Sequence, residues 1–195
     1  TVDFLEKNNV DAIKVSKGDV NNVLLIDKIA KTKLPVIIDA REKLEDIDKA
    51  RKICLENGNE QIIIMHCPSG YPSEDVGVHL NAISFLQQHY EYPIAFSDHS
   101  PGDIMNYAAV AMGVTMLEKT ITVDKTISHV EHFMSLELSE LKEFIQNIRK
   151  LESAMGNSNI LYSSRVEENA RRSLVSKRQI IKNTTLSIDD LEFKR

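Results

Sequence analysis

The segment Ser97-Asp98-His99-Ser100 brings a carboxylate, an imidazole and two hydroxyls together within four residues. It directly follows the apolar run 92–96, and a helical pattern begins at Asn106. Where a buried strand gives way to a helix, α/β folds place their chemistry at the carboxyl edge of a parallel sheet. A neutral imidazole at that edge can bind a divalent metal, which polarises a carbonyl group. The segment therefore predicts an enzyme, or a part of one.

Lys14 and two serines are candidates for holding a small anion. Lys14 lies in the apolar run 12–15, and a cation within such a run seldom lacks a partner. Its ammonium can meet a phosphate as a point charge, and Ser69 and Ser97, each just past a strand, supply hydroxyl donors. The alternative for Lys14 is an exposed lysine at a strand end. Together these residues predict a cradle for phosphate or carboxylate.

Three carboxylates are candidates for work around His99. Asp98 or Glu118 can orient the imidazole as a hydrogen-bond acceptor, and Glu131 can accept from a hydroxyl or take a proton from water. The alternative for His99 is a core histidine that only hydrogen-bonds, and for Glu131 a solvated loop acid.

Cys67 also follows a histidine. We expect it to be a packed side chain rather than a catalytic thiol, because no third orienting group is evident.

Five short apolar runs must position these residues. The runs are continuously apolar, which is typical of strands buried on both faces. Helical periodicity fills the gaps between them, so we expect a parallel sheet with right-handed crossovers. The expected strands are 12–15, 34–38, 61–65, 93–96 and 114–117, and the C-cap signals Asn57-Gly58 and Met155-Gly156 end two of the helices.

The number of strand and helix units points to a partial barrel. A complete eight-unit barrel needs about 250 residues, whereas this chain has 195. Residues 2–7 have the pattern of the tail of a helix already under way, so we expect the chain to enter the barrel in its middle. An open doubly wound sheet is the competing architecture, but its glycine-rich dinucleotide turn has no counterpart here. The expected fold is α/β, the C-terminal five units of a (β/α)8 TIM barrel.

The character of the chain changes after Gly156. Residues 1–156 are expected to form the partial barrel, and the polar stretch 157–168 is interpreted as a linker. Residues 169–195 are expected to begin a second small domain, or to form a docked tail, with a short strand within 170–177. About 25 residues cannot bury a core alone.

Composition and charge limit the classes of partner. A formal net charge of -5 argues against a nucleic-acid or anionic-membrane surface and favours a small, anionic substrate. No apolar run approaches the length of a membrane span, and the first residues lack the design of a signal peptide. Two cysteines are too few for a disulfide framework and suit a reducing cytosol. We therefore expect a cytoplasmic protein.

A series of short blocks runs in a set order through nearly the whole chain. The blocks are Val10-Asp11-Ala12-Ile13-Lys14-Val15 with Gly18-Asp19, His66-Cys67-Pro68-Ser69-Gly70-Tyr71-Pro72, Glu74-Asp75-Val76 with Leu80-Asn81-Ala82-Ile83, Ser97-Asp98-His99-Ser100, Glu118-Lys119, Glu131-His132 with Ser135-Leu136, and Ala170-Arg171-Arg172-Ser173. In order and spacing they resemble the sialic acid synthase family. Members of that family condense phosphoenolpyruvate with an N-acetylated amino sugar to a nonulosonic acid and release phosphate.

The resemblance implies an architecture and partners. In the family a (β/α)8 barrel is followed by a linker and an antifreeze-like domain, which reaches into the partner's active site in a domain-swapped homodimer. By this resemblance the chain starts after the third barrel strand and stops inside the antifreeze-like domain. Such a partial chain is expected to have little activity by itself, because five units leave open sheet edges and a half-built pocket.

The resemblance also implies roles for single residues. The family's corresponding lysine and serines hold phosphoenolpyruvate, which implies that role for Lys14, Ser69 and Ser97. His99 corresponds to one of two protein ligands of a divalent metal, expected to be manganese, with magnesium or cobalt as alternatives. Glu131 stands where the family has an aspartate that contacts the sugar and a catalytic water.

Three further residues complete the candidate site. Glu118 is assigned to the catalytic set with His99, and Asp98 to substrate binding. Tyr71 either lines the pocket for the sugar or packs beside it, and we favour the pocket.

Three positions depart from the family pattern. Thr120 replaces the second metal-binding histidine, so metal binding is expected to be weaker or differently arranged, unless His129 or His132 compensates. Asp39-Ala40-Arg41 replaces Ser-Thr-Gly, and Ser16-Lys17 replaces a small residue and serine. The new cations can contact a phosphate or carboxylate, or Asp39 and Arg41 can pair with each other on the rim.

Two functions from different classes follow. The first is a phosphoenolpyruvate-dependent, carbon-carbon bond-forming synthase. The alternative, which Thr120 and Asp39 motivate, is a non-catalytic or regulatory relative that binds a sugar or phosphate with a degenerate metal site.

Overall fold

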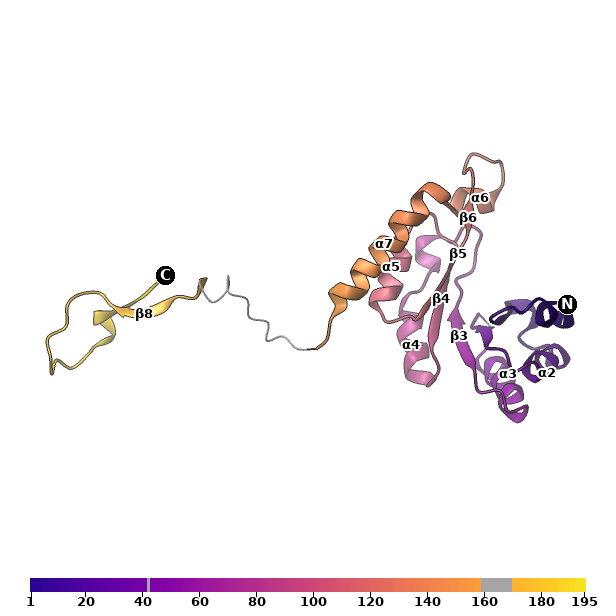
Figure 1. Cartoon of the computed structure of the whole chain (residues 1–195), viewed down its shortest axis with the longest axis horizontal. Helices are drawn as coiled ribbons and strands as arrows, with labels where there is room; N and C mark the ends of the chain where they lie inside the picture. The colour runs from indigo at the N-terminus through magenta and orange to yellow at the C-terminus, as the bar shows by residue number, and fades with distance from the viewer. Residues whose placement is uncertain (42, 159–169) are drawn as a thin grey trace. The chain divides into compact units, whose positions relative to one another are not determined.

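The computed structural model describes residues 1–41, 43–158 and 170–195 (Figure 1). Contacts between residues divide the chain into two compact units, Thr1–Gly156 and Asn157–Arg195. Each unit is described by itself below.

A five-stranded parallel sheet forms the centre of the first unit. Its strands are β1 (Ile13–Val15), β2 (Val36–Asp39), β3 (Ile62–His66), β4 (Ile94–Asp98) and β5 (Met116–Lys119), and they lie in the order β1-β2-β3-β4-β5. Every neighbouring pair is parallel, as the alternation of strands and helices predicts. Strands β2 to β5 reach further toward their carboxyl ends than the apolar runs do. Polar residues such as Asp39 and His66 are therefore part of the sheet.

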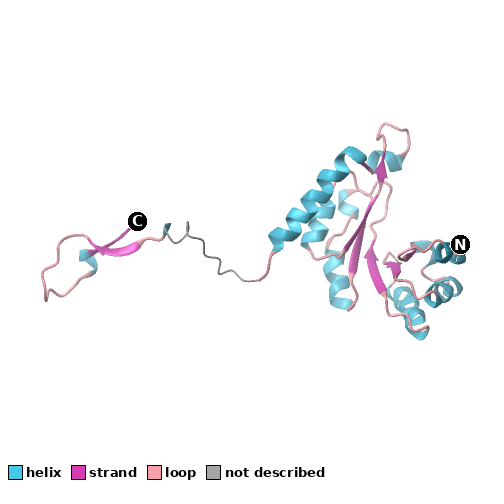
Figure 2. Ribbon diagram, in the orientation of Figure 1, coloured by secondary structure: helices cyan, strands magenta, loops and turns pink. Residues whose placement is uncertain are grey.

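Helices follow the strands and cover one face of the sheet (Figure 2). They are α1 (Val2–Lys7), α2 (Val23–Lys31), α3 (Leu44–Glu56), α4 (Asn81–His89), α5 (Ile104–Ala111) and α7 (Leu138–Met155), with the 3-10 turns η1 (Lys17–Asp19) and η2 (Asp75–Gly77). The predicted C-caps are confirmed, because α3 ends before Asn57 and α7 before Gly156. Gly58 and Gly156 both have a positive φ, which only glycine adopts without strain.

The two faces of the sheet carry different side chains. Alternate residues such as Val36, Ile38 and Phe96 point to the helices and form the main core. The other residues form a second, smaller cluster built on Ile37, Met65, Cys67 and Ala95. Toward the carboxyl ends of the strands, this second face becomes polar. The predicted packing of Cys67 agrees with its complete burial.

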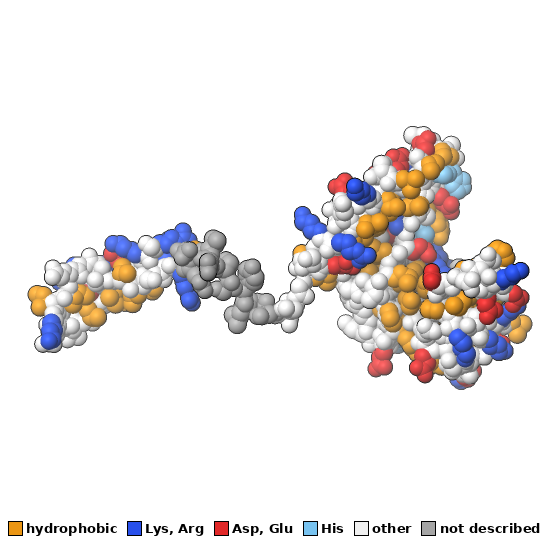
Figure 3. Space-filling model, viewed as in Figure 1, with side chains coloured by type: hydrophobic (Ala, Val, Ile, Leu, Met, Phe, Trp, Pro, Cys, Tyr) orange, Lys and Arg blue, Asp and Glu red, His pale blue; other side chains and the backbone are white. Residues whose placement is uncertain are grey.

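The connection between β5 and α7 contains three short elements that were not expected from the sequence. Strand β6 (Ile121–Thr122) pairs in parallel with β7 (Leu136–Glu137), and helix α6 (Val130–Met134) lies between them. Hydrophobic side chains gather on the surface here, over α6 and the residues around it (Figure 3). They include Val123, Ile127 and Phe133, which are exposed. Within the described ranges, no helix is long and apolar enough to cross a membrane.

The second unit contains a small antiparallel pair. Strand β8 (Ser173–Ser176) pairs with β9 (Leu191–Lys194), and η3 (Ile188–Asp190) directly precedes β9. β8 lies inside the stretch 170–177 that was expected to form a strand. Most of the predicted linker 157–168 lies outside the described residues, since 159–169 are not described. The antifreeze-like domain stays a prediction.

Candidate active site

Lys14 and Glu118 meet across the whole width of the sheet. The Nζ atom of Lys14 lies 2.5 Å from Oε1 of Glu118, although the two residues belong to the first and the last strand. In a flat sheet, strands four places apart are roughly 19 Å from each other, which is more than these two side chains can bridge. The sheet is therefore strongly curved, and the face with Lys14 and Glu118 is concave.

Ser97 connects this ion pair to His99. The Ser97 hydroxyl donates to Oε1 of Glu118 at 2.6 Å and lies 3.1 Å from Nε2 of His99. Since an ionised carboxylate only accepts, the single hydroxyl proton goes to Glu118, and Ser97 accepts from Nε2–H. This assigns the proton of a neutral His99 to Nε2 and leaves a lone pair on Nδ1. That Nδ1 is buried and has no hydrogen-bond partner among the described residues.

The surroundings favour a charged Glu118 and a neutral His99. Burial alone raises the pKa of Glu118, but the hydrogen bonds from Lys14 and Ser97 outweigh it, so that the pKa is lowered. Burial lowers the pKa of His99, and Arg41 and Lys14 add to this effect against the opposing charge of Glu118. A neutral imidazole with a free lone pair can accept a proton or bind a metal ion.

Asp98 points to the other face of the sheet. Its fully buried carboxylate accepts from the backbone and hydroxyl of Ser100, from Asn106 and from Lys119. The Lys119 side chain is only 4% exposed, so the two form a buried ion pair 2.7 Å long. Asp98 was assigned to substrate binding. Here its donors tie the loop after β4 to β5 and α5.

Asp39 and Arg41 form a second buried ion pair. The carboxylate of Asp39 is completely buried, and Nη2 of Arg41 lies 2.5 Å from it. Hydrogen bonding to Asp39 raises the pKa of Arg41. The two residues pair as the alternative interpretation expected. The pair, however, is buried beside Cys67 rather than exposed on a rim.

Three of the predicted site residues lie at the surface. Tyr71 is 46% exposed and packs on His99, with ring centroids 4.3 Å apart. Ser69 and Glu131 are exposed, and neither hydrogen-bonds to the Lys14–Glu118 pair or to His99 within the part of the chain that the structure describes. The alternative for Glu131 was a solvated loop acid, and the residue is indeed exposed, but it lies in helix α6.

A metal at His99 has few ligands to draw on. The register Ser97↔Glu118, continued by two residues, brings His99 beside Thr120, whose hydroxyl is likewise buried and unpartnered. His132 hydrogen-bonds to Thr122 at 2.6 Å, which engages its Nδ1. Among the described residues, no three His, Cys, Asp or Glu side chains converge in a metal-binding group. One imidazole and one hydroxyl do not make a transition-metal site, so these residues do not fit a tightly held metal.

The sequence contained a signal that separates Asp98 from its neighbours. Successive residues of a strand point to opposite faces, so Ser97 and His99 share one face while Asp98 takes the other. Applied to β5, the same rule puts Glu118 with Ser97 and Lys119 with Asp98, as observed. The burial of Lys119 was missed because a lysine is rarely buried.

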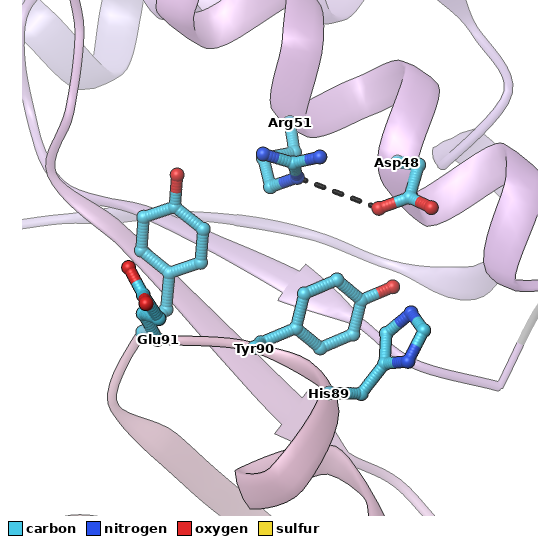
Figure 4. A pocket seen from close by; sticks show the side chains of 6 residues that line it. Asp48, Arg51, His89, Tyr90 and Glu91 are labelled. Carbon is cyan, nitrogen blue, oxygen red and sulfur yellow. Dashed lines mark ion pairs between the residues drawn. The ribbon is translucent and has the colours of Figure 1, made fainter.

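A second hollow lies between α3 and the segment before β4, away from His99 (Figure 4). It has a volume of about 500 Å³ and is lined by Asp48, Arg51, His89, Tyr90, Glu91 and Tyr92. Its guanidinium and one of its carboxylates already form an ion pair 3.4 Å long. None of the predicted site residues lines it.

Comparison with known proteins shows which proteins the chain is similar to. Residues 1–160 match the model of the NeuB family. The chain is 37% identical to the uncharacterized protein MJ1065 of Methanocaldococcus jannaschii, over all of this chain and 59% of that protein. It is 34% identical to the N-acetylneuraminate-9-phosphate synthase of Homo sapiens, over 99% of this chain and 55% of the relative.

A solved structure agrees with these relatives. The N-acetylneuraminic acid (sialic acid) synthetase of Leptospira borgpetersenii superposes with a TM-score of 0.77 at 29% identity, over 87% of this chain and 59% of that one. The chain thus spans less than two thirds of the length of the proteins it matches.

Proposed function

The chain belongs to the NeuB family, and on that premise we propose that the protein condenses phosphoenolpyruvate with an N-acetylated amino sugar. Carbon 3 of the enol attacks the sugar aldehyde, whose oxygen takes up a proton. Water adds to carbon 2, and cleavage of the carbon-oxygen bond releases phosphate. The product is a nonulosonic acid of the sialic acid type. Relatives named as synthases of N-acetylneuraminate 9-phosphate, diacetyllegionaminic acid and pseudaminic acid support this class of reaction.

The observation that carries the proposal is the line of contacts Lys14–Glu118–Ser97–His99 on the concave face. Lys14 supplies a cation that is neutralised by Glu118 until an anion competes for it. The phosphate or carboxylate of phosphoenolpyruvate is such an anion, and a half-buried ammonium binds it more strongly than an exposed one does.

His99 supplies the acid-base chemistry of the site. Its Nε2–H bond to Ser97 fixes the ring, so that the Nδ1 lone pair can take the proton of the attacking water. Because this atom is buried, the substrates must displace a neighbouring side chain to reach it. We assign the amino sugar to the side of Tyr71, which covers the ring of His99.

Other parts of the proposal rest on the family resemblance. We propose that Ser69 joins Ser97 in holding phosphoenolpyruvate, and that Glu131 contacts the sugar. We also propose that the complete protein is a domain-swapped homodimer. A cytoplasmic site of action suits Cys54 and Cys67, which are free thiols. The divalent metal expected at His99 also stays a prediction.

The decisive experiment follows phosphate release by the full-length protein, with phosphoenolpyruvate and a panel of N-acetylated amino sugars that includes N-acetylmannosamine. We expect His99→Ala to lower kcat by roughly a hundredfold or more, the usual size of an acid-base contribution. We expect Lys14→Ala to raise KM for phosphoenolpyruvate by about tenfold or more, because a charged contact is lost.

The control is Arg149→Ala, which removes an exposed ion pair on α7. It is expected to behave as the unchanged protein does. Unaltered turnover in a folded His99→Ala variant would contradict the proposed role of His99.

The alternative function, a binding protein without catalysis, is favoured by Thr120 and by the lack of a three-ligand group among the residues that the structure describes. It predicts that phosphoenolpyruvate or the sugar binds in calorimetry while no sugar in the panel releases phosphate. Release of phosphate with any of these sugars rejects it.

A further inference from the structure

Asp39 joins the loops that follow the first two strands. Its carboxylate accepts from the backbone nitrogen of Lys17 at 3.2 Å and from that of Arg41 at 3.0 Å. It also accepts from Nε and Nη2 of the Arg41 guanidinium. These donors use both carboxylate oxygens, and they hold the guanidinium in one orientation.

Arg41 in turn reaches the loop that follows β3. Asp39 occupies Nε and Nη2, and the guanidinium still has donors left, since it carries five N–H groups. The hydroxyl of Tyr71 interacts with this guanidinium, and the interaction contributes to the raised pKa of Arg41. The Arg41 side chain is only 15% exposed, so this contact lies largely out of water.

The ring of Tyr71 is not held in place by burial. Nearly half of the residue is exposed, and its ring lies against His99 at an angle of 40°. An exposed ring with free rotamers leaves such a position unless something at its far end holds it. Arg41 lies next to the Tyr71 hydroxyl, at the end of the side chain that extends beyond the ring.

The backbone of this loop is held by other contacts. Ser73 donates its backbone N–H to the carbonyl of His99 at 2.9 Å and its hydroxyl to the carbonyl of Gly70 at 3.1 Å. The ring of His66 lies 2.8 Å from the carbonyl oxygen of Val78, at the end of the loop. A change at Arg41 therefore acts on the Tyr71 side chain and leaves the loop in place.

We propose that Arg41, fixed by Asp39, is a positioning residue that holds the Tyr71 ring over His99 and thereby shapes the side of the pocket assigned to the amino sugar. The first part stands on the contacts alone, whereas the link to the sugar rests on the proposed function. An arginine suits this task because its planar fork binds a carboxylate with two donors and keeps others for a further group. A lysine provides only a point charge.

Selective NMR of the histidine rings tests the contact without any assay of activity. The full-length protein is labelled in histidine, and the His99 signals are assigned by their loss in His99→Gln. At a ring-centroid distance of 4.3 Å, the aromatic current of Tyr71 shifts the His99 proton signals. Tyr71→Leu defines the shift without the ring.

Arg41→Lys is the informative variant because it keeps the positive charge and removes the fork. We expect its His99 signals to move most of the way to those of Tyr71→Leu. The matched control Arg149→Lys, on the exposed face of α7, is expected to leave them unchanged. His99 signals in Arg41→Lys that coincide with those of the unchanged protein overturn the proposal.

Kinetics then test the link to the sugar. With full-length protein, Arg41→Lys and Tyr71→Leu are both expected to raise KM for the amino sugar by about tenfold while KM for phosphoenolpyruvate changes by less than about twofold. Equal changes for both substrates, or none, overturn the link. Arg41→Gln is a second variant for the case that the lysine variant is unfolded in a thermal scan. Shifted NMR signals in a protein that turns over no sugar support the positioning role and reject the proposed function.

Discussion

The single proton of the Ser97 hydroxyl determines which nitrogen of His99 is free. Because that proton goes to Glu118, Nε2 of His99 is the donor and Nδ1 keeps its lone pair. The same atom is the one that a metal ion would use. At His99, acid-base chemistry and metal binding therefore exclude each other at any one moment.

Thr120 makes manganese binding a sharp test of this site. Since the described residues offer one imidazole and one hydroxyl, we expect full-length protein to bind manganese weakly in calorimetry, and His99→Ala not at all. Thr120→His places a second imidazole beside His99 by register. It is expected to tighten manganese binding by at least about tenfold, the size of effect that ligand changes have. Equal affinities for the unchanged protein and Thr120→His would contradict this placement.

Residue types predicted part of the site and missed the rest for a physical reason. The sequence singled out Lys14, Ser97 and His99, which the structure connects through Glu118, because polar groups at strand ends stand out in an apolar run. The sequence did raise the pairing of Asp39 with Arg41, but it gave no sign that the pair is buried or that it reaches Tyr71. Burial and contacts between loops depend on how separate loops fold together, which local sequence does not encode.

The pairing of β4 with β5 places two polar contacts, one hydrogen bond and one ion pair, on opposite faces of the sheet. Ser97 and Glu118 lie on the concave face with Lys14, whereas Asp98 and Lys119 face the helices. The second pair lies on the opposite face of the sheet from Lys14 and Glu118. It connects β4 to β5, and Asp98 also accepts hydrogen bonds from Ser100 in the loop after β4. These contacts fix the position of the loop that carries His99.

Removing Asp98 therefore affects stability directly. Asp98→Ala leaves the ammonium of Lys119 buried without its partner, and we expect a loss of about 3 to 5 kcal/mol in the free energy of unfolding. Urea unfolding followed by circular dichroism measures this. Asp3→Ala breaks an ion pair that lies at the surface and is the matched control, for which little change is expected. A loss in Asp98→Ala no larger than in the control would show that the pair is not structural.

The long elements were predictable and the short ones were not. Continuous apolar runs and helical periodicity identified all five strands of the sheet and the helices α2, α3, α4 and α7. Strands of two residues and a helix of five residues are too short to show a period, which is why β6, α6 and β7 escaped notice. For the same reason the alternative for Glu131 was a loop acid, whereas the residue lies in α6.

Because several buried groups have shifted pKa values, the free energy of unfolding is expected to be highest within a limited range of pH. Burial lowers the pKa of His66 and His99 from 6.5, so the unfolded chain binds more protons below that pH and stability falls. The lowered pKa of Glu118 adds a further loss as the pH falls below 4.5. Burial raises the pKa of Cys54 to about 11 and that of Cys67 to about 12, from 9.0, so stability falls again as the pH rises above 9.0.

The prediction is a plateau of stability between pH 6.5 and 9.0. Urea midpoints measured at about pH 5, 7.5 and 10 are expected to be highest at the middle value. His99→Gln should reduce the difference between the two lower values, whereas His89→Gln, at the exposed end of α4, should not. A midpoint for the unchanged protein that is the same at the lowest and middle values would contradict it.

The curvature of the sheet is a property that no single segment of sequence shows. Five parallel strands are compatible with an open sheet or a partial barrel, and the contact between Lys14 and Glu118 distinguishes them. That contact joins residues 104 positions apart in the chain. Neither residue type nor periodicity encodes such a pairing.

This contact also couples recognition of an anion to the shape of the protein. An anion that takes the ammonium of Lys14 draws it away from Glu118, and so it weakens the ion pair that, in the described part of the chain, joins the two outer strands. Such coupling is reciprocal. If binding of the anion shifts the equilibrium between two arrangements of the strands by some factor, the affinity for the anion differs between those arrangements by the same factor. On the proposed function, substitutions far from Lys14, along either outer strand, thereby become a way to tune the affinity for the anion.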